Sequence, residues 1–229
     1  MRAFDPYALP PRYVGEVVGS SWSPPPGFTE KVVALTFDDG PDKLYTAPVL
    51  QILKEQRIPA TMFVVGIKVN QQRKQVEQER SMGLEIANHT YSHFSWPSPF
   101  IAGPEVLLTE SAINMTQSPH SHVFRPPYGQ AAGATSIFAK SIGMASVLWT
   151  NDTHDWELTS PTTMVNYAIS QMRPGDIVLM HDNRQVTPLG LRQIIRAYRT
   201  AGYQFLTVTQ MLWRWDAFIN ATTQPKVKM

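Results

Sequence analysis

Seven short apolar runs, rich in β-branched and aromatic residues, recur from residue 31 onward, and segments with helical spacing separate them. Strands that alternate with helices are typical of a parallel sheet, which either closes into a barrel or stays open with helices on both faces. A chain of 229 residues is long enough for one large α/β domain of either kind. The predicted strands cover residues 32–37, 60–65, 84–88, 122–125, 145–149, 176–180 and 204–208.

Two segments between these strands carry apolar residues three and four positions apart, as the buried face of a helix requires. These residues are Val49, Ile52 and Leu53 in the first segment, and Leu191, Ile194, Ile195 and Tyr198 in the second. Thr46 is the predicted N-cap of the first helix, because its hydroxyl can accept a hydrogen bond from a free backbone N–H. Gly202 is the predicted end of the second, since glycine readily adopts the left-handed conformation that terminates helices.

The two ends of the chain are expected to lie outside the main domain. Residues 1–30 are rich in proline and glycine, and they predict an irregular arm that packs on the domain through Tyr13 or Trp22. We predict a single main domain over residues 31–215 and a C-terminal tail over residues 216–229. No internal sequence repeat indicates a further division.

Charge and composition exclude several classes of function. The formal net charge is +2, from 20 basic and 18 acidic residues, so bulk electrostatics give no reason to expect a nucleic acid or an anionic membrane as partner. The absence of cysteine excludes disulfides and thiol chemistry. No stretch approaches the ~20 apolar residues of a transmembrane helix, and residues 1–18 lack the basic head and apolar run of a signal peptide.

The first predicted strand, within VVALTFDDG, runs directly into Asp38 and Asp39. Adjacent carboxylates at the end of a buried strand cost free energy unless a cation or a proton offsets their charge. Polar, titratable residues also follow four further strands, and the carboxyl ends of parallel strands carry the chemistry in both candidate architectures. These residues are His89, His93, Arg125, Tyr128, Asp152, Asp155, His181 and Asp182. We therefore predict the functional site at this edge of the sheet.

His89 and His93 are the strongest indication of a metal. Their four-residue spacing would place both rings on one face of a helical turn. With one carboxylate added, they form a two-histidine, one-carboxylate site, which suits zinc or a related divalent ion such as cobalt or iron. Such a site leaves coordination open for water.

Five short motifs occur in a fixed order along the chain. TFDDGP (36–41), HTYSH (89–93), RPPYG (125–129), DTHDW (152–156) and LMH (179–181) resemble the five motifs of the polysaccharide deacetylases, the NodB-homology proteins of carbohydrate esterase family 4. The resemblance covers residues 31–212, and five ordered motifs are far more specific than any single one. It implies a distorted (β/α)7 barrel and a metal-dependent hydrolysis of an acetamide.

The resemblance implies a division of labour between the two adjacent aspartates. Asp39, His89 and His93 would bind the metal, which lowers the pKa of bound water. Asp38 would be the general base and must stay ionised, with Arg125 as the cation that tethers it.

The remaining roles concern the substrate and the leaving group. The backbone N–H of Tyr128 would contribute to an oxyanion site. His181 would donate a proton to the leaving amine, with Asp155 orienting its ring and raising its pKa. Trp156 and Leu179 would form the walls of a small apolar slot for the acetyl methyl, although plain core packing accounts for these two residues equally well.

The full set of motifs favours an N-deacetylase acting on β-1,4-linked N-acetylglucosamine, in peptidoglycan or chitin oligomers. The same site also suits an O-deacetylase of acetylated xylan, because the same attack by water cleaves an ester more easily than an amide. Hydrolysis of a small cyclic amide ranks low, since barrel relatives of that kind usually lose parts of the metal motif. A catalytically silent glycan-binding module and a purely structural protein rank low as well, because all the motif residues are present.

The resemblance also implies the setting in which the chain works. We expect an extracellular or cell-envelope protein, a monomer without a membrane span, with an N-acetylated glycan as its partner. Zn²⁺ is the expected metal, with Co²⁺ or Ni²⁺ as alternatives. Asp152 is expected to cap a turn and Asp182 to orient backbone. The segment FSWPSPFIAGPEVLL after His93 departs from the usual family text and is expected to border the cleft.

Overall fold

Parallel strands form the centre of the computed structural model, which describes residues 5–19, 24–115 and 121–223. Within these ranges nine strands lie in one sheet, in the order β1-β6-β5-β4-β3-β2-β8-β7, and β9 also pairs with β2. The strands are β1 Val17–Val18, β2 Val32–Gly40, β3 Thr61–Val64, β4 Glu85–Asn88, β5 Val123–Phe124, β6 Ala145–Val147, β7 Asn151–Asp152, β8 Asp176–His181 and β9 Gln204–Leu206.

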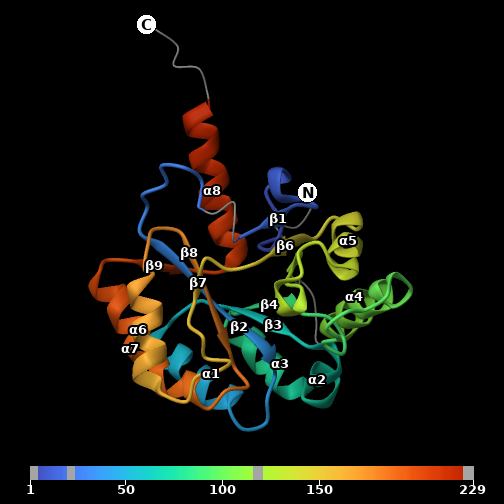
Figure 1. The fold of residues 1–229 in the computed structure, drawn as a ribbon, viewed down its shortest axis with the longest axis horizontal. Helices are drawn as coiled ribbons and strands as arrows, with labels where there is room; N and C mark the ends of the chain where they lie inside the picture. The colour runs from blue at the N-terminus through green and yellow to red at the C-terminus, as the bar shows by residue number, and fades with distance from the viewer. Residues whose placement is uncertain (1–4, 20–23, 116–120, 224–229) are drawn as a thin grey trace, which may run out of the picture.

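Helices connect most of these strands and cover the outside of the sheet (Figure 1). They are η1 Pro11–Tyr13, α1 Thr46–Gln56, α2 Gly66–Gln71, α3 Arg73–Ser81, α4 Pro99–Asn114, η2 Pro127–Gly129, α5 Ala134–Ser141, α6 Pro161–Ser170, α7 Val186–Thr200 and α8 Val208–Thr223. None of the helices in the described ranges has the length and apolar character needed to cross a membrane.

The sheet curls into an incompletely closed barrel. β6 and β7 lie toward opposite ends of the row of strands, yet only residues 148–150 separate them in the chain, so the two ends must approach one another. The predicted distorted (β/α)7 barrel is confirmed, and so are all seven predicted strands. The sequence patterns did not predict β1, which lies in the segment expected to be irregular, or β7, which consists of two polar residues and has no apolar run.

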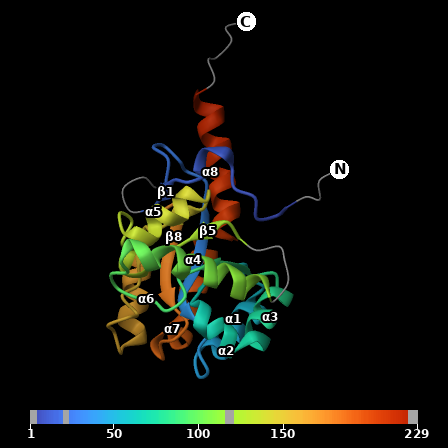
Figure 2. The ribbon, with the colours of Figure 1, turned by 90° about the vertical axis from the view of Figure 1, so that its right-hand side faces the viewer.

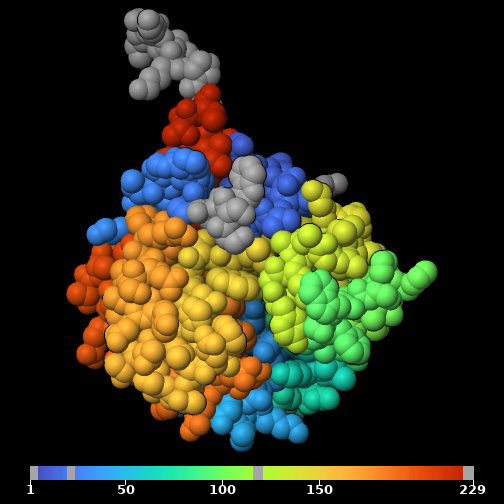
Figure 3. Space-filling model, in the orientation of Figure 1, coloured from blue at the N-terminus to red at the C-terminus, as the bar shows by residue number. Residues whose placement is uncertain are grey.

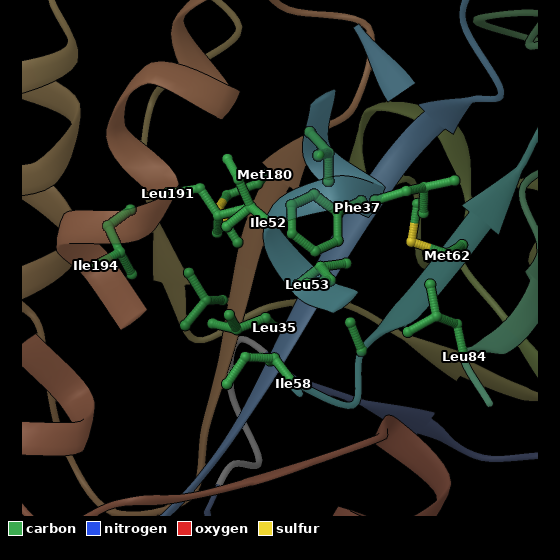
Figure 4. Packing of buried hydrophobic residues seen from close by; sticks show 14 of the residues in the cluster. Leu35, Phe37, Ile52, Leu53, Ile58, Met62, Leu84, Met180, Leu191 and Ile194 are labelled. Carbon is green, nitrogen blue, oxygen red and sulfur yellow. The ribbon is translucent and has the colours of Figure 1, made fainter. Parts of the chain in front are cut away.

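Alternating residues of β2 point to opposite sides of the sheet, as strand geometry requires. Leu35 and Phe37 pack outward against Leu53 of α1 and Leu191 of α7 (Figure 4). Val32 and Ala34 belong instead to a second cluster inside the barrel, with Phe63 of β3 and Ile177 of β8. The same alternation turns Thr36 and Asp38 inward at the carboxyl end of β2.

Helix α8 and the N-terminal segment close the amino end of the barrel, opposite α1 and α2 (Figures 1 and 2). Trp215 of α8 is buried there, together with Tyr13 and Phe28. The buried Glu85 carboxylate joins this helix to the barrel: it accepts hydrogen bonds from the hydroxyls of Thr61, Ser121 and Thr209 and from the Thr209 backbone N–H.

The N-terminal segment is more regular than predicted. Residues 17–18 form β1, which pairs in parallel with β6. Tyr13 is buried, as expected for a packed arm, whereas Trp22 lies outside the described residues. Helix α8 continues past residue 216, where the tail was predicted to begin, and the domain boundaries stay a prediction.

The predicted helix ends differ in outcome. Gly202 follows α7 and adopts a φ of +84°, which confirms its role as a helix stop. The Thr46 N-cap is wrong, because α1 begins at Thr46 and Tyr45 takes the cap position. The Thr46 hydroxyl bonds elsewhere: it donates to the Asp182 carboxylate and accepts from the backbone N–H of Asp42.

Candidate active site

A pocket of about 490 Å³ opens at the carboxyl ends of the strands. Figure 3 shows it as a hollow between the gold surface around α6 and the yellow-green surface after β5. Eight of the ten predicted site residues line it: Asp38, Asp39, His89, His93, Tyr128, Trp156, Leu179 and His181. The other two, Arg125 and Asp155, are buried and contact residues that line the pocket.

Three potential metal ligands converge at the base of this pocket. Asp39 Oδ1 lies 3.1 Å from His93 Nε2 and 3.4 Å from His89 Nε2. The ligand atoms of all three residues lie within 4.8 Å of one another, and Asp39 Oδ1 is buried without a hydrogen-bond donor in the described structure. Two imidazoles and an orphaned carboxylate oxygen therefore fit a divalent cation.

The hydrogen bond of His89 Nδ1 shows which ring nitrogen is free to bind a metal ion. His89 Nδ1 lies 2.7 Å from the Arg125 carbonyl oxygen, which can only accept a hydrogen bond. Nδ1 therefore carries the proton, and Nε2 presents its lone pair toward Asp39. This arrangement is the usual support of a metal-binding histidine.

Asp39 is held ionised by its surroundings. Burial would raise the pKa of its carboxyl, but the imidazoles of His89 and His93 beside it and the charge of His181 hold that pKa well below its usual range. Asn183 Nδ2 donates to Asp39 Oδ2 over 3.1 Å, and Lys68 Nζ donates to the Asp39 carbonyl over 2.7 Å. The sequence analysis missed Asn183, although its place two residues after His181 could have indicated it.

The loop that carries His89 and His93 is not a helical turn, so the structural reason given for their pairing is wrong. Thr90 and His93 adopt positive φ angles of 65° and 58°, which bend the chain back. Glu105 of α4 holds this bend: its carboxylate accepts hydrogen bonds from the backbone N–H groups of residues 91 and 92. The two imidazole rings nevertheless lie with centroids 4.9 Å apart.

Arg125 extends inside the barrel beneath the pocket and contacts Asp38. Its Nη1 lies 2.7 Å from both Asp38 Oδ1 and Thr36 Oγ1. Its Nε and Nη2 donate to the carbonyls of Val147 and Leu148. Burial lowers the pKa of Arg125, whereas the charge of Asp38 raises it. The predicted contact between Arg125 and Asp38 is therefore a buried ion pair. The guanidinium also donates hydrogen bonds to a hydroxyl and to two backbone carbonyls.

His181 and Asp155 form a second hydrogen-bonded pair across the pocket. His181 Nδ1 lies 2.7 Å from Asp155 Oδ1, while Asp155 Oδ2 accepts from the His181 backbone N–H and from the Thr187 hydroxyl. Burial alone would lower the pKa of His181, but the hydrogen bond and charge of Asp155, with the charges of Asp38 and Asp39, raise it to about 9. A pKa raised in this way favours the protonated ring at neutral pH.

Aromatic and apolar side chains form the upper part of the pocket. Trp156 is 45% exposed and Tyr128 63% exposed, so neither is a core residue. The Tyr128 ring packs against His93, with centroids 4.9 Å apart, and the residue has a φ of +57°. Leu179 is buried yet contributes to the pocket lining. Trp149, which the sequence analysis did not select, lines the pocket as well.

The predicted role of Asp182 in orienting backbone stays a prediction. Its backbone N–H donates to the carbonyl of Asp38, its carboxylate accepts from the Thr46 hydroxyl, and burial raises the pKa of its carboxyl to about 7. A Cβ atom on Gly40 would lie 2.2 Å from Asp182 Oδ2, so only glycine fits at the end of β2. Asp152 lines the pocket and accepts from the His154 backbone N–H, a contact that fits its predicted turn-capping role.

Comparisons with known proteins agree with this geometry. Residues 26–147 match the family model described as polysaccharide deacetylase. A peptidoglycan-N-acetylglucosamine deacetylase of Bacillus cereus is 34% identical over 189 residues, which cover 80% of this chain and 89% of the relative. A chitooligosaccharide deacetylase of a Bradyrhizobium species is 33% identical over 232 residues, which cover 92% of this chain and 100% of the relative.

A solved structure extends the likeness to the fold. The peptidoglycan deacetylase PdaC of Bacillus subtilis superposes with a TM-score of 0.76 at 30% identity, over 84% of this chain and 95% of that one. The family model covers more than half of the chain, and the Bacillus cereus relative is covered almost completely. The chain therefore belongs to the polysaccharide deacetylase family, a family of enzymes, as its five motifs predicted.

Proposed function

We propose that the chain removes N-acetyl groups from N-acetylglucosamine residues of a β-1,4-linked glycan by hydrolysis. The observation that carries this proposal is the arrangement of the pocket. A carboxylate paired with a buried arginine and an imidazole paired with a buried carboxylate line the same pocket as the cluster of Asp39, His89 and His93. Amide hydrolysis needs a base, an acid and stabilisation of negative charge on the carbonyl oxygen.

Asp39, His89 and His93 are the residues that would hold a divalent metal, with Zn²⁺ proposed and Co²⁺ or Ni²⁺ as alternatives. When bound, such an ion supplies Lewis acidity and lowers the pKa of water from ~15.7 toward neutrality. Asp38 Oδ2 lies 3.8 Å from His89 Nε2, close to this cluster, while Oδ1 bonds to Arg125. This proximity supports the proposal that Asp38 takes a proton from the attacking water.

His181 acts at the other end of the reaction. Its raised pKa keeps the ring protonated near neutral pH, and Asp155 fixes the ring through Nδ1, leaving Nε2 to donate. The proton passes to the nitrogen of the leaving amine as the C–N bond breaks.

The remaining pocket residues position the acetyl group. The backbone N–H of Tyr128 is proposed to donate to the developing oxyanion. Trp156 and Leu179 are proposed to enclose the acetyl methyl, since both contribute apolar surface to the pocket.

The substrate proposed is peptidoglycan or a chitin oligosaccharide, on the strength of the activities named for the Bacillus cereus and Bradyrhizobium relatives. Action on a cell-wall glycan further supports a location outside the cell or at its envelope. An O-deacetylase of acetylated xylan uses the same pocket chemistry and is the second candidate. A silent binding module would leave the base, the acid and the three potential ligands without a use.

Acetate release tests the proposal. The purified chain, loaded with Zn²⁺, is incubated in parallel with chitooligosaccharides, peptidoglycan fragments and acetylxylan. We expect acetate from an N-acetylated glycan, lost on chelation and restored by added metal. Arg196→Gln, a change at an exposed arginine on α7, is the control and should release acetate as the wild-type protein does. No acetate from any N-acetylated glycan overturns the proposal, and acetate from acetylxylan alone establishes the second candidate.

A further inference from the structure

A second cavity opens beside the catalytic pocket. This side groove, of about 340 Å³, is lined by Trp156, Glu157, Thr159, Arg184, Gln185 and Leu189, among others. Trp156 and Arg184 line both cavities. A ligand in the catalytic pocket can therefore extend past Trp156 into the side groove, with Arg184 at the junction between the two.

Arg184 is an unpaired cation at this junction. Its side chain is exposed, and it makes no hydrogen bond or ion pair with any residue in the described part of the chain. Other arginines differ: Arg125 is paired with Asp38, and Arg192 on α7 is paired with Glu55. A charged guanidinium offers five donors in a planar fork, which matches the geometry of a carboxylate.

The acidic groups that line the side groove are already engaged by other residues. Glu157 Oε1 lies 2.8 Å from His154 Nδ1. The Asp155 carboxylate bonds to His181 and Thr187. Arg184 is therefore left to bind an anion that comes from outside the chain.

The two glycans proposed as substrates differ in the charge of the sugars next to N-acetylglucosamine. The sugars of a chitin oligomer are neutral, whereas every second sugar of peptidoglycan carries a lactyl ether that ends in a carboxylate or in a peptide. We propose that Arg184 binds a carboxylate on the sugar next to the one that loses its acetyl group, in the side groove beyond Trp156. The inference rests on the proposed function. The contact with Arg184 would make this chain selective for acidic glycans.

The test compares two substrates that differ only in charge. One is the peptide-free tetrasaccharide of alternating N-acetylglucosamine and N-acetylmuramic acid, and the other is the same molecule with its lactyl carboxyls converted to carboxamides. The ratio of kcat/KM for the acid to kcat/KM for the amide isolates the charge from the size of the substituent. We expect the wild-type ratio to exceed one and to fall as salt is added, because an exposed ion pair is screened.

Variants then assign the effect to one side chain. Arg184→Gln is expected to lower the ratio about tenfold, and Arg184→Glu to lower it further, because a rim charge attracts or repels the substrate carboxylate. Arg196→Gln, at an exposed arginine on α7 that lines neither cavity, is the matched control and should keep the wild-type ratio. An unchanged ratio in both Arg184 variants overturns the inference. Wild-type protein that releases no acetate from either substrate or from chitooligosaccharides overturns the proposed function instead, so the two failures are distinguishable.

Discussion

Arg125 Nη1 lies 2.7 Å from Asp38 Oδ1, and the two side chains form an ion pair shielded from solvent inside the barrel. This pair offsets the charge of one of the two adjacent aspartates in VVALTFDDG. Asp38 is neutralised by a protein cation, whereas Asp39 faces two imidazoles that together with it can hold a metal ion. Two neighbouring residues of the same type thus have different surroundings, because successive side chains of a strand point in different directions.

Arg125→Met is expected to destabilise the fold. Removing one partner of a buried ion pair leaves an uncompensated charge and costs about 3–5 kcal/mol. The free energy of unfolding, measured with urea, checks this. Combining Arg125→Met with Asp38→Asn should recover part of the loss, since both charges are then gone. Arg192→Gln, which breaks the exposed pair with Glu55, is the control and should change little. Equal losses in Arg125→Met and the control would contradict the prediction.

Asp38→Asn and Asp39→Ala are expected to fail differently. Asp38→Asn should keep the metal and lower kcat by about 10²–10⁴-fold, because the base is lost while all three potential ligands remain. Asp39→Ala should lose metal affinity, because one of three potential ligands is gone. Metal content after dialysis and acetate release are measured on the same samples. If both variants lost metal equally, the division of labour between the two aspartates would be wrong.

Asp155→Asn is expected to move the alkaline limb of the pH profile. His181 must be protonated to act as the acid, so activity falls as the pH rises through its pKa, which is raised to about 9. Replacing Asp155 by a neutral amide lowers that pKa, and the loss of kcat/KM should begin roughly one pH unit lower or more. Glu55→Gln, at an exposed residue, is the control. An alkaline limb that stays at the wild-type pH would show that another group titrates there.

Glu85→Ala is expected to destabilise the amino end of the barrel without removing the catalytic groups. The Glu85 carboxylate accepts from three hydroxyls and from the Thr209 backbone N–H, and those donors lose their partner. We expect a loss of about 3 kcal/mol in the free energy of unfolding. Glu30→Ala, at the partly exposed pair with Arg214, should cost far less. Acetate release by the folded variant at low temperature should stay near the wild-type value.

Local patterns predicted most of the barrel. An apolar run of five to six residues is enough to indicate a strand, and residues at the carboxyl ends of parallel strands share one edge wherever the strands lie in the sheet. Asp38, His89 and His181 could therefore be placed at one site without knowing the strand order. Strands β1 and β7 could not be predicted, because β7 has no apolar run and β1 depends on pairing with β6.

The details of the site depend on contacts that are distant in sequence. Threonine is a common N-cap residue, but the Thr46 hydroxyl bonds to Asp182, 136 residues away in the sequence. The approach of His89 and His93 comes from a bend with positive φ angles held by Glu105, and not from helical spacing. Asn183 and Arg184 have no periodic signal, so only their positions in the folded chain show that one bonds Asp39 and the other lines two cavities.

The sequence by itself determined the strands, the alternation of their side chains and the identity of the groups at their carboxyl ends, because these follow from local period and residue chemistry. Only the tertiary structure decided which group faces which. It paired Asp38 with Arg125 and Asp39 with the histidines, and among the residues that the structure describes it left Arg184 without a partner beside Trp156. The physical reason is that burial, ion pairing and pKa depend on distances between strands that no local pattern contains.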